Sequence, residues 1–188
     1  MSFIFKRLIN TATKDYFKVF PKTFPEQRPT FKVDLRKLRK EYRGLQAINH
    51  PDLNQKLNQE EGASSVINHA YNTLKSPLNR SQYLLKLLKG YDVAEDEFFR
   101  TRQMADKELL MTILEIHEEL ENANENDIEG LKQENDARIQ ETVQELEKLY
   151  EAEDYDAAAL GTIKLKYWVN IDTALKNWEL GKPVELTH

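Results

Sequence analysis

The stretch that decides the fold reads DLRKLRKEYRGLQAINHPD and covers residues 34–52. Apolar side chains recur in it every three or four residues, which predicts an amphipathic helix over residues 34–48 that begins at the N-cap Asp34. The apolar positions are Leu35, Leu38, Tyr42 and Leu45, and the opposite face carries Arg36, Arg39, Lys40 and Arg43. Such a face is usually only solvated. Four cations with almost no acid between them instead favour a docking surface for an acidic partner.

A His-Pro-Asp tripeptide, His50-Pro51-Asp52, follows this helix, and a second helix is predicted over residues 60–75. Its apolar stripe is Val66, Ile67, Ala70, Tyr71 and Leu74. Pairing the two stripes predicts an antiparallel hairpin with the tripeptide at its tip. A catalytic dyad of His50 and Asp52 is a weak alternative, because Pro51 holds its φ near about −65° and nothing nearby supplies a nucleophile or an oxyanion site.

The rest of the chain also predicts helices. A short helix over residues 13–20 ends at Pro21, the loop PKTFPEQRP follows, and residues 78–88 form a helix after Ser76-Pro77. Three longer helices are predicted over residues 105–122, 127–152 and 155–178. Their short connections imply antiparallel neighbours. The predicted fold class is therefore all-α, with an N-terminal helical hairpin joined to a C-terminal three-helix bundle.

Charge divides the chain into two halves. Residues 1–90 hold 17 Lys and Arg against 7 Asp and Glu, a net charge of +10, whereas residues 91–188 hold 10 against 25, a net charge of −15. We predict domains over residues 13–90 and 91–188 on this basis. Nucleic acid is a poor candidate partner, because the basic residues are dispersed and the acidic half would repel phosphates.

Several kinds of chemistry are excluded by composition. The chain has no cysteine, so disulfides, thiolate metal ligation and cysteine nucleophiles are excluded. No two of its four histidines are spaced at i, i+4 as a helical metal site requires, and we predict no metal and no cofactor. A membrane span would need about 18 consecutive apolar residues, and the sequence contains no such run.

The first residues, MSFIFKRLINTATK, contain no acid and place Phe5, Leu8 and Ile9 on one helical face beside Lys6 and Arg7. A basic, amphipathic, hydroxyl-containing start is typical of a mitochondrial targeting segment, which we predict over residues 1–12. An ordinary frayed terminus is the alternative, and these residues alone do not decide between the two.

The helix predicted over residues 105–122 has more apolar surface than one interface needs. Leu109, Ile113, Ile116 and Leu120 suffice for a bundle core, whereas Leu110, Met111 and Leu114 lie on an adjacent face that continues into His117 and Glu118. The second face is either a protein-binding patch or the edge of a wide core face. Periodicity alone slightly favours the core.

The helix, His-Pro-Asp loop and second helix together resemble a J-domain, the module with which DnaJ-type cochaperones engage DnaK-class ATPase chaperones. The resemblance implies that His50, Pro51 and Asp52 carry the signal that stimulates ATP hydrolysis by the chaperone. It also implies that Arg36, Arg39, Lys40 and Arg43 form the docking face. The protein would then be no enzyme but an activator of a partner ATPase.

The acidic half resembles the HscB-type cochaperones of iron-sulfur cluster biogenesis through LMTILEIHEEL (residues 110–120) and LKYW (165–168). The match includes PKTFP, LRKEYR, SPLNRSQYLLKLL and the final ELTH, and it is closest to the fungal mitochondrial members. It implies delivery of an iron-sulfur scaffold protein to a chaperone of the mitochondrial matrix. The implied scaffold contacts are Leu109, Leu110, Met111, Leu114, Glu115, His117, Glu118 and Tyr167.

Two departures from the family pattern concern the site. The Cys-rich zinc element of some members is absent, so no metal is implied, and His117 stands where the family often has Arg. A general J-domain cochaperone for unfolded clients is the alternative function. Such proteins usually add Gly/Phe-rich and Cys-rich zinc segments, and the sequence has neither.

Overall fold

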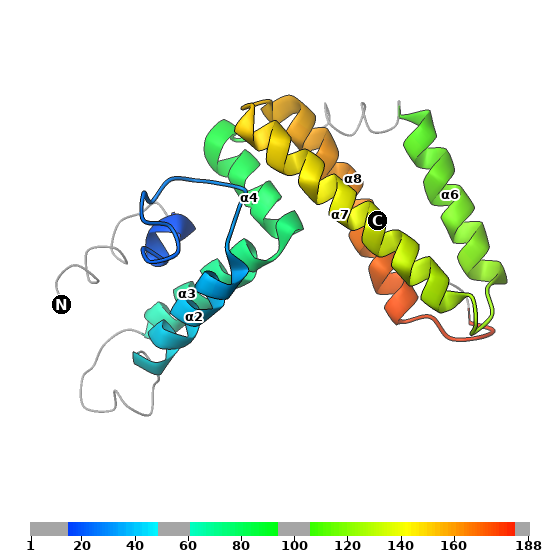
Figure 1. Cartoon of the computed structure of the whole chain (residues 1–188), viewed down its shortest axis with the longest axis horizontal. Coiled ribbons are helices and arrows are strands. Elements are labelled where there is room, and N and C mark those ends of the chain that lie inside the picture. The colour runs from blue at the N-terminus through cyan, green and yellow to red at the C-terminus, as the bar shows by residue number, and fades with distance from the viewer. Residues whose placement is uncertain (1–14, 49–60, 94–105, 183–188) are drawn as a thin grey trace. The chain divides into compact units, whose positions relative to one another are not determined.

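The computed structural model describes residues 15–48, 61–93 and 106–182, and all regular structure in these ranges is helical (Figure 1). The elements are the 3-10 helix η1 (Tyr16–Val19) and the α-helices α2 (Leu35–Ile48), α3 (Glu61–Lys75), α4 (Pro77–Lys89), α6 (Lys107–Asn122), α7 (Ile128–Glu151) and α8 (Tyr155–Lys176). The all-α prediction is confirmed. None of the helices in the described ranges combines the length and apolarity needed to cross a bilayer.

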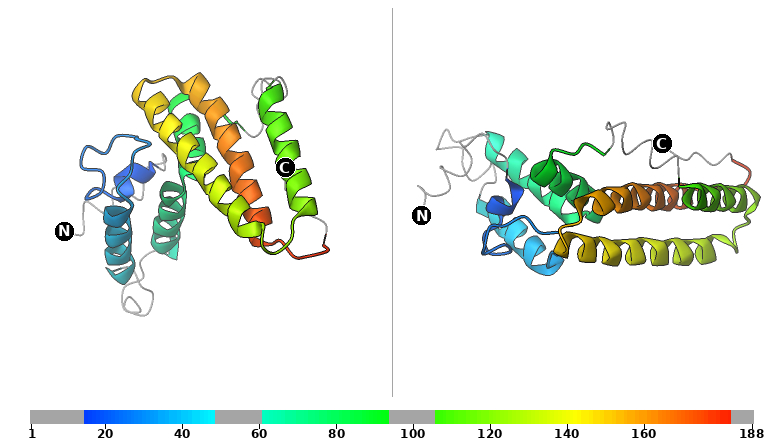
Figure 2. Two further views of the ribbon diagram at one scale, coloured as in Figure 1. Left: turned by 45° about the vertical axis from the view of Figure 1, so that its right-hand side comes forward. Right: turned by 90° about the horizontal axis from the view of Figure 1, so that it is seen from above.

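In the first compact unit, residues 1–80, α2 and α3 pair as the predicted hairpin (Figure 2). The ring of Tyr42 stacks on that of Tyr71 with centroids 3.9 Å apart and 11° between the planes. Next to this stack, Oδ1 of Asn68 accepts hydrogen bonds of 2.7 Å from the Tyr42 hydroxyl and from Nε2 of Gln46. These contacts set the antiparallel register of the two helices.

Phenylalanines from the segment before α2 fill much of the core of this unit. Phe17, Phe20, Phe24 and Phe31 are buried, together with Leu38 of α2 and Ile67, Ala70 and Leu74 of α3. Phe17 and Phe24 meet edge to face with centroids 4.9 Å apart. Asp15 caps η1 by accepting the N–H of Phe17 at 3.1 Å. Phe24 of the predicted Pro-rich loop is therefore part of the core, although most other residues of the loop are exposed.

Leu35 is a correction to the predicted core stripe of α2. Its side chain is 49% exposed, whereas Leu38, one turn later, is fully buried. The hairpin register explains the difference, because Tyr42 lies opposite Tyr71 and Leu35, seven residues earlier, therefore falls level with residue 78, beyond the end of α3 at Lys75. The first turn of α2 thus has no turn of α3 to pack against.

Glu41 is a buried carboxylate on the otherwise basic helix α2. Its oxygens accept hydrogen bonds from the N–H of Lys22 at 2.9 Å and from both the N–H and the hydroxyl of Thr23 at 2.7 Å. The side chain is only 9% exposed. Glu41 therefore attaches the turn that carries Phe20 and Phe24 to α2.

We expect Glu41→Ala to destabilise the protein by about 2–4 kcal/mol, because hydrogen bonds to a charged group contribute about 1.5–3 kcal/mol and two backbone donors would lose their partner. Urea unfolding followed by circular dichroism measures the effect. Glu26→Ala is the matched control, since Glu26 is exposed and forms a surface ion pair with Arg28 at 3.8 Å. Equal midpoints for the two variants would contradict the role given to Glu41.

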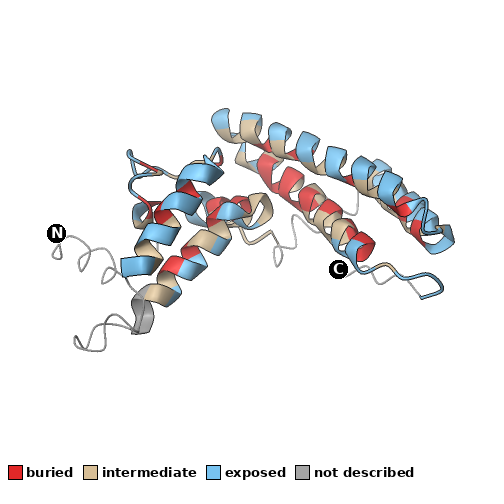
Figure 3. Ribbon diagram, turned by 60° about the horizontal axis from the view of Figure 1, so that its bottom comes forward, coloured by how far each residue is buried: buried red, intermediate tan, exposed pale blue. Residues whose placement is uncertain are grey.

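The second compact unit, residues 81–188, is built around the antiparallel pair of α7 and α8. Buried residues concentrate on α8 (Figure 3). Gly161 permits a close approach of the two helices, because a Cβ at this position would lie 3.0 Å from the Leu146 side chain. The pair is tied by buried polar groups as well: Nδ2 of Asn135 donates to the Trp168 carbonyl at 2.9 Å, and Nε1 of Trp168 donates to Thr142 at 3.1 Å.

Helix α6 completes the three-helix bundle of this unit. Ile116 and Leu120 are buried in a cluster with Ile128, Trp168, Ile171 and Leu175, and Leu109 and Ile113 pack against that cluster half-buried. The stripe predicted for the core is the one that faces it. Nε1 of Trp178, beyond the end of α8, donates to the Leu120 carbonyl at 3.1 Å. This hydrogen bond attaches the C-terminal end of α6 to the segment that follows α8.

The two units divide between Arg80 and Ser81, inside α4 and before the boundary near residue 90 that the charge pattern predicts. Hydrogen bonds explain why most of α4 belongs to the second unit. The Ser81 hydroxyl lies 2.6 Å from that of Thr162 and 2.8 Å from that of Tyr150. Further along, the Tyr91 hydroxyl donates to Asp156 at 2.8 Å. The charge pattern follows surface residues and contains no information about these contacts.

Candidate functional site

The side chains of Arg36, Arg39, Lys40 and Arg43 are all exposed on α2, and we call them the basic face. In the described part of the chain none of the four forms an ion pair, whereas two other cations of this unit do: Lys37 lies 3.8 Å from Asp34, and Lys18 lies 3.3 Å from Asp15. Together with Leu35, the basic face lines an open groove of about 370 Å³. Its positive charge is therefore available to a partner.

Asp34, which precedes the basic face in the sequence, is engaged in capping the start of α2. Oδ1 of Asp34 accepts the N–H groups of Arg36 and Lys37, each at 3.0 Å. These hydrogen bonds, chiefly that from the N–H of Lys37, hold the pKa of the Asp34 carboxyl below its ordinary value. Asp34 is consequently ionised at neutral pH, but its charge stabilises the first turn of α2 and pairs with Lys37.

The His50-Pro51-Asp52 tripeptide lies outside the described residues. Helix α2 ends at Ile48, so the tripeptide follows the basic face in sequence with one residue, Asn49, after the helix end. Its assignment as a functional loop remains a prediction from the sequence.

Helix α6 presents Leu110, Met111 and Leu114 on the side next to its core stripe, and we call these three residues the apolar patch. Met111 is 56% exposed and Leu114 is 63% exposed, while Leu110 is half-buried. A wide core face would bury all three. The core of the bundle includes the face of α6 that carries Ile116 and Leu120, and it does not include Met111 or Leu114. These two apolar side chains therefore remain at the surface.

The other predicted scaffold contacts fall into two groups that differ in burial. Glu115 and Glu118 are exposed, and His117 is half-buried with Nδ1 3.7 Å from a carboxylate oxygen of Glu121. Leu109 and Tyr167 instead pack, half-buried, against the core cluster of the bundle. The predicted set therefore combines a surface part on α6 with a part that also supports the bundle.

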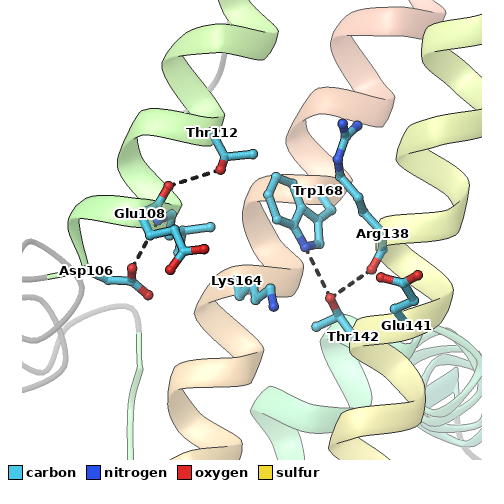
Figure 4. A pocket seen from close by; sticks show the side chains of 9 residues that line it. Asp106, Glu108, Thr112, Arg138, Glu141, Thr142, Lys164 and Trp168 are labelled. Carbon is cyan, nitrogen blue, oxygen red and sulfur yellow. Dashed lines mark hydrogen bonds between the residues drawn. The ribbon is translucent and has the colours of Figure 1, made fainter.

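A polar pocket of about 330 Å³ lies between α6, α7 and α8 (Figure 4). Several of its groups are engaged within the protein: Arg138 pairs with Glu134 at 3.3 Å, Lys164 with Glu145 at 3.8 Å, and Asp106 caps α6 by accepting the N–H of Leu109. No cysteine, serine or histidine lines it. Its threonines Thr112 and Thr142 donate to backbone carbonyls of α6 and α7. Because these polar groups bond within the protein, we interpret the pocket as a polar part of the helix packing and call it the polar seam of the bundle.

The described residues contain no group of three His, Asp or Glu side chains arranged to hold a metal ion. Together with the engaged groups of the polar seam, this leaves two surfaces as the functional candidates: the basic face and the apolar patch. Both are suited to binding another protein. The surface position of Leu35, which lines the groove beside the basic face, was missed because its spacing matches the core stripe.

Two family models match the chain, and they correspond to the two surfaces. The DnaJ domain model matches residues 29–83, which contain the basic face, and the HSCB C-terminal oligomerisation domain model matches residues 105–176, which contain the apolar patch. The fold and its two surfaces therefore define a J-domain protein with an additional C-terminal helical domain.

Comparison with known proteins specifies the family. The mitochondrial J-type co-chaperone JAC1 of Saccharomyces cerevisiae is 42% identical, over 94% of this chain and 95% of its own. The human iron-sulfur cluster co-chaperone protein HscB is 32% identical, over 87% of this chain and 68% of its own. A solved structure of yeast Jac1, residues 5–182, aligns with a TM-score of 0.79, covering 94% of this chain and all of that one. The chain belongs to the HscB family of J-type co-chaperones, alongside yeast Jac1.

Proposed function

We propose that this protein is a mitochondrial co-chaperone of iron-sulfur cluster biogenesis. It binds a cluster scaffold protein through its second domain and docks on a DnaK-class chaperone of the matrix through its J-domain. Docking stimulates ATP hydrolysis by the chaperone, which traps the scaffold and promotes cluster transfer. The names of the yeast and human relatives, one mitochondrial and one an iron-sulfur cluster co-chaperone, support this assignment.

The observation that carries the chaperone part is the unpaired basic face. Four exposed cations without an ion pair in the described ranges lie on the helix that leads to His50-Pro51-Asp52. Unpaired surface cations attract an acidic partner over several ångströms and orient it on approach. The tripeptide follows this helix in the sequence, and the J-domain resemblance implies that it contacts the docked chaperone.

The scaffold part is supported by the exposure of Met111 and Leu114. Apolar side chains with polar surroundings are typical of the centre of a protein-protein interface. Glu115 and Glu118 border them and are exposed. We assign the scaffold contact to Leu109, Leu110, Met111, Leu114, Glu115, His117, Glu118 and Tyr167. Of these, Leu109 and Tyr167 also pack against the core cluster and would support the exposed members.

Two paired measurements test the function. A pull-down compares capture of a folded iron-sulfur scaffold with capture of an unfolded model client, and an ATPase assay measures the DnaK-class chaperone with and without this protein. Retention of the folded scaffold together with a raised ATPase rate is expected. Preference for the unfolded client would support the general cochaperone instead. ATP hydrolysis by the protein in the absence of chaperone would contradict both.

Charge reversal of the basic face, Arg39→Glu with Lys40→Glu, should slow association with the chaperone by about 10-fold or more at low salt, because steering charges act mainly on the association rate. The deficit should shrink as salt rises. Stopped-flow association rates between about 0.02 and 0.5 M salt measure it. Lys176→Glu with Lys182→Glu is a control for net charge, as both lysines are in the second unit, where they pair with Asp172 and Glu179. A deficit independent of salt would contradict a steering role.

A further inference from the structure

We propose that Leu35 is an apolar anchor within the basic face, and that it selects a chaperone surface on which an apolar side chain is bordered by carboxylates. This inference rests on the chaperone docking proposed above and adds a specificity-determining residue to it. The basic face alone would accept any acidic surface. An apolar contact beside the cations narrows the choice of partner.

Leu35 is at the surface although its spacing matches the core. It is 49% exposed, and Leu38 fills the adjacent core position completely. Its side chain lines the same groove as Arg36, Arg39, Lys40 and Arg43. Leu35 also stands four residues before Arg39 and eight before Arg43, so that the three follow one ridge of the helix.

The chemistry of the groove defines its occupant. Each arginine holds its charge at the end of an aliphatic stem, so the groove has apolar walls at its base and cations at its rim. A partner side chain that is apolar at the tip, with Asp or Glu on either side, satisfies both parts at once. Phosphate or nucleic acid would use the cations but leave Leu35 without a contact. The groove therefore fits an acidic protein surface with an apolar centre.

The test compares affinity for the DnaK-class chaperone across a salt series for wild-type protein and for Leu35→Ala. Burial of the exposed part of a leucine corresponds to about tenfold in the dissociation constant. We expect Leu35→Ala to bind about tenfold more weakly at every salt concentration, because an apolar contact is not screened. Arg43→Ala should instead change the slope of affinity against salt. Leu35→Met should retain near wild-type affinity.

Leu180→Ala is the matched control, since Leu180 is 64% exposed and lies beyond α8 in the second unit. It should bind like the wild type. Wild-type affinity in Leu35→Ala would overturn the anchor while leaving the docking proposal intact. Failure of the wild type to bind or stimulate the chaperone would overturn the docking proposal itself, and the anchor with it. A lowered thermal midpoint in Leu35→Ala, with unchanged affinity of the folded fraction, would show a structural role only.

Discussion

His50→Gln should reduce stimulation of the chaperone ATPase to near the basal rate while leaving the helical content and the thermal midpoint unchanged. The J-domain resemblance implies that the tripeptide carries the stimulating signal. Glutamine lacks the imidazole ring and cannot present the ring's nitrogen donor and acceptor in the same geometry. A residue of the loop that the sequence predicts between the two helices should contribute little to the core, so folding should not change. Single-turnover ATP hydrolysis by the chaperone, with and without the variant, measures the effect.

His69→Gln is the matched control for loss of an imidazole. His69 is exposed on α3, where its ring meets the edge of Tyr16 with centroids 5.4 Å apart. We expect this variant to stimulate the chaperone normally. Scaffold affinity should be equal in the wild type and both variants, because both histidines lie outside residues 106–182. Full stimulation by His50→Gln would remove the basis for the J-domain function.

Replacing Leu110, Leu114 and Tyr167 together by Ala should weaken scaffold binding by about a thousandfold or more. Each side chain would contribute roughly 1.5–3 kcal/mol when buried at an interface, and a summed loss of ~4 kcal/mol corresponds to that factor. Calorimetric titration of the scaffold against wild-type and variant protein measures the change. Wild-type affinity in a folded triple variant would contradict the site.

Stability separates the surface part of this site from its supporting part. Tyr167 packs against the core cluster, so its removal should lower the thermal midpoint, whereas Met111 and Leu114 are mostly exposed. The double variant Met111→Ala with Leu114→Ala should therefore lose scaffold affinity at a nearly unchanged midpoint. Ile116→Ala is the contrasting variant in the buried stripe and should lose about 2–5 kcal/mol of stability. If the double variant unfolds as readily as Ile116→Ala, the patch belongs to the bundle core.

Helical periodicity predicted most of the fold because apolar spacing reports directly which face of a helix is buried. The stripe ending at Leu120 on α6 and the stripe ending at Leu74 on α3 both face cores in the structure. Helix ends were predicted within a few residues: the helix predicted over residues 155–178 is α8, Tyr155–Lys176, and Asp154 caps it by accepting the N–H of Ala157 at 3.1 Å. These signals are local, and local signals can be read from sequence.

Other features depend on contacts between distant residues. Leu35 has core spacing but falls level with a position beyond the end of α3, and a single helix contains no information about where its neighbour ends. Glutamate is usually a surface residue, and the burial of Glu41 is explained by its hydrogen bonds to the turn at Lys22 and Thr23. The unit boundary inside α4 follows from hydrogen bonds of Ser81 to residues about 70 and 80 positions away.

The apolar patch is an intermediate case. Periodicity showed that α6 has two adjacent apolar faces and slightly favoured burial of both in the core, whereas Met111 and Leu114 are exposed in the structure. The exposure of Leu114 depends on where α7 and α8 stop covering α6, which is a property of the packed unit. The sequence had placed Leu110, Met111 and Leu114 on that second face, because an apolar surplus on one helix is visible before any packing is known. Their role as a binding patch stays a prediction.

The two tryptophans of the chain give its second unit an optical label that the first unit lacks. Trp168 is buried, with its indole N–H bonded to Thr142, and Trp178 is half-buried, with its indole N–H bonded to the Leu120 carbonyl. Indole emission consequently reports the solvation of the α6 to α8 bundle alone, while far-ultraviolet ellipticity sums the helices of both units. The ratio of the two signals can therefore separate melting of one unit from melting of the other without any introduced fluorophore.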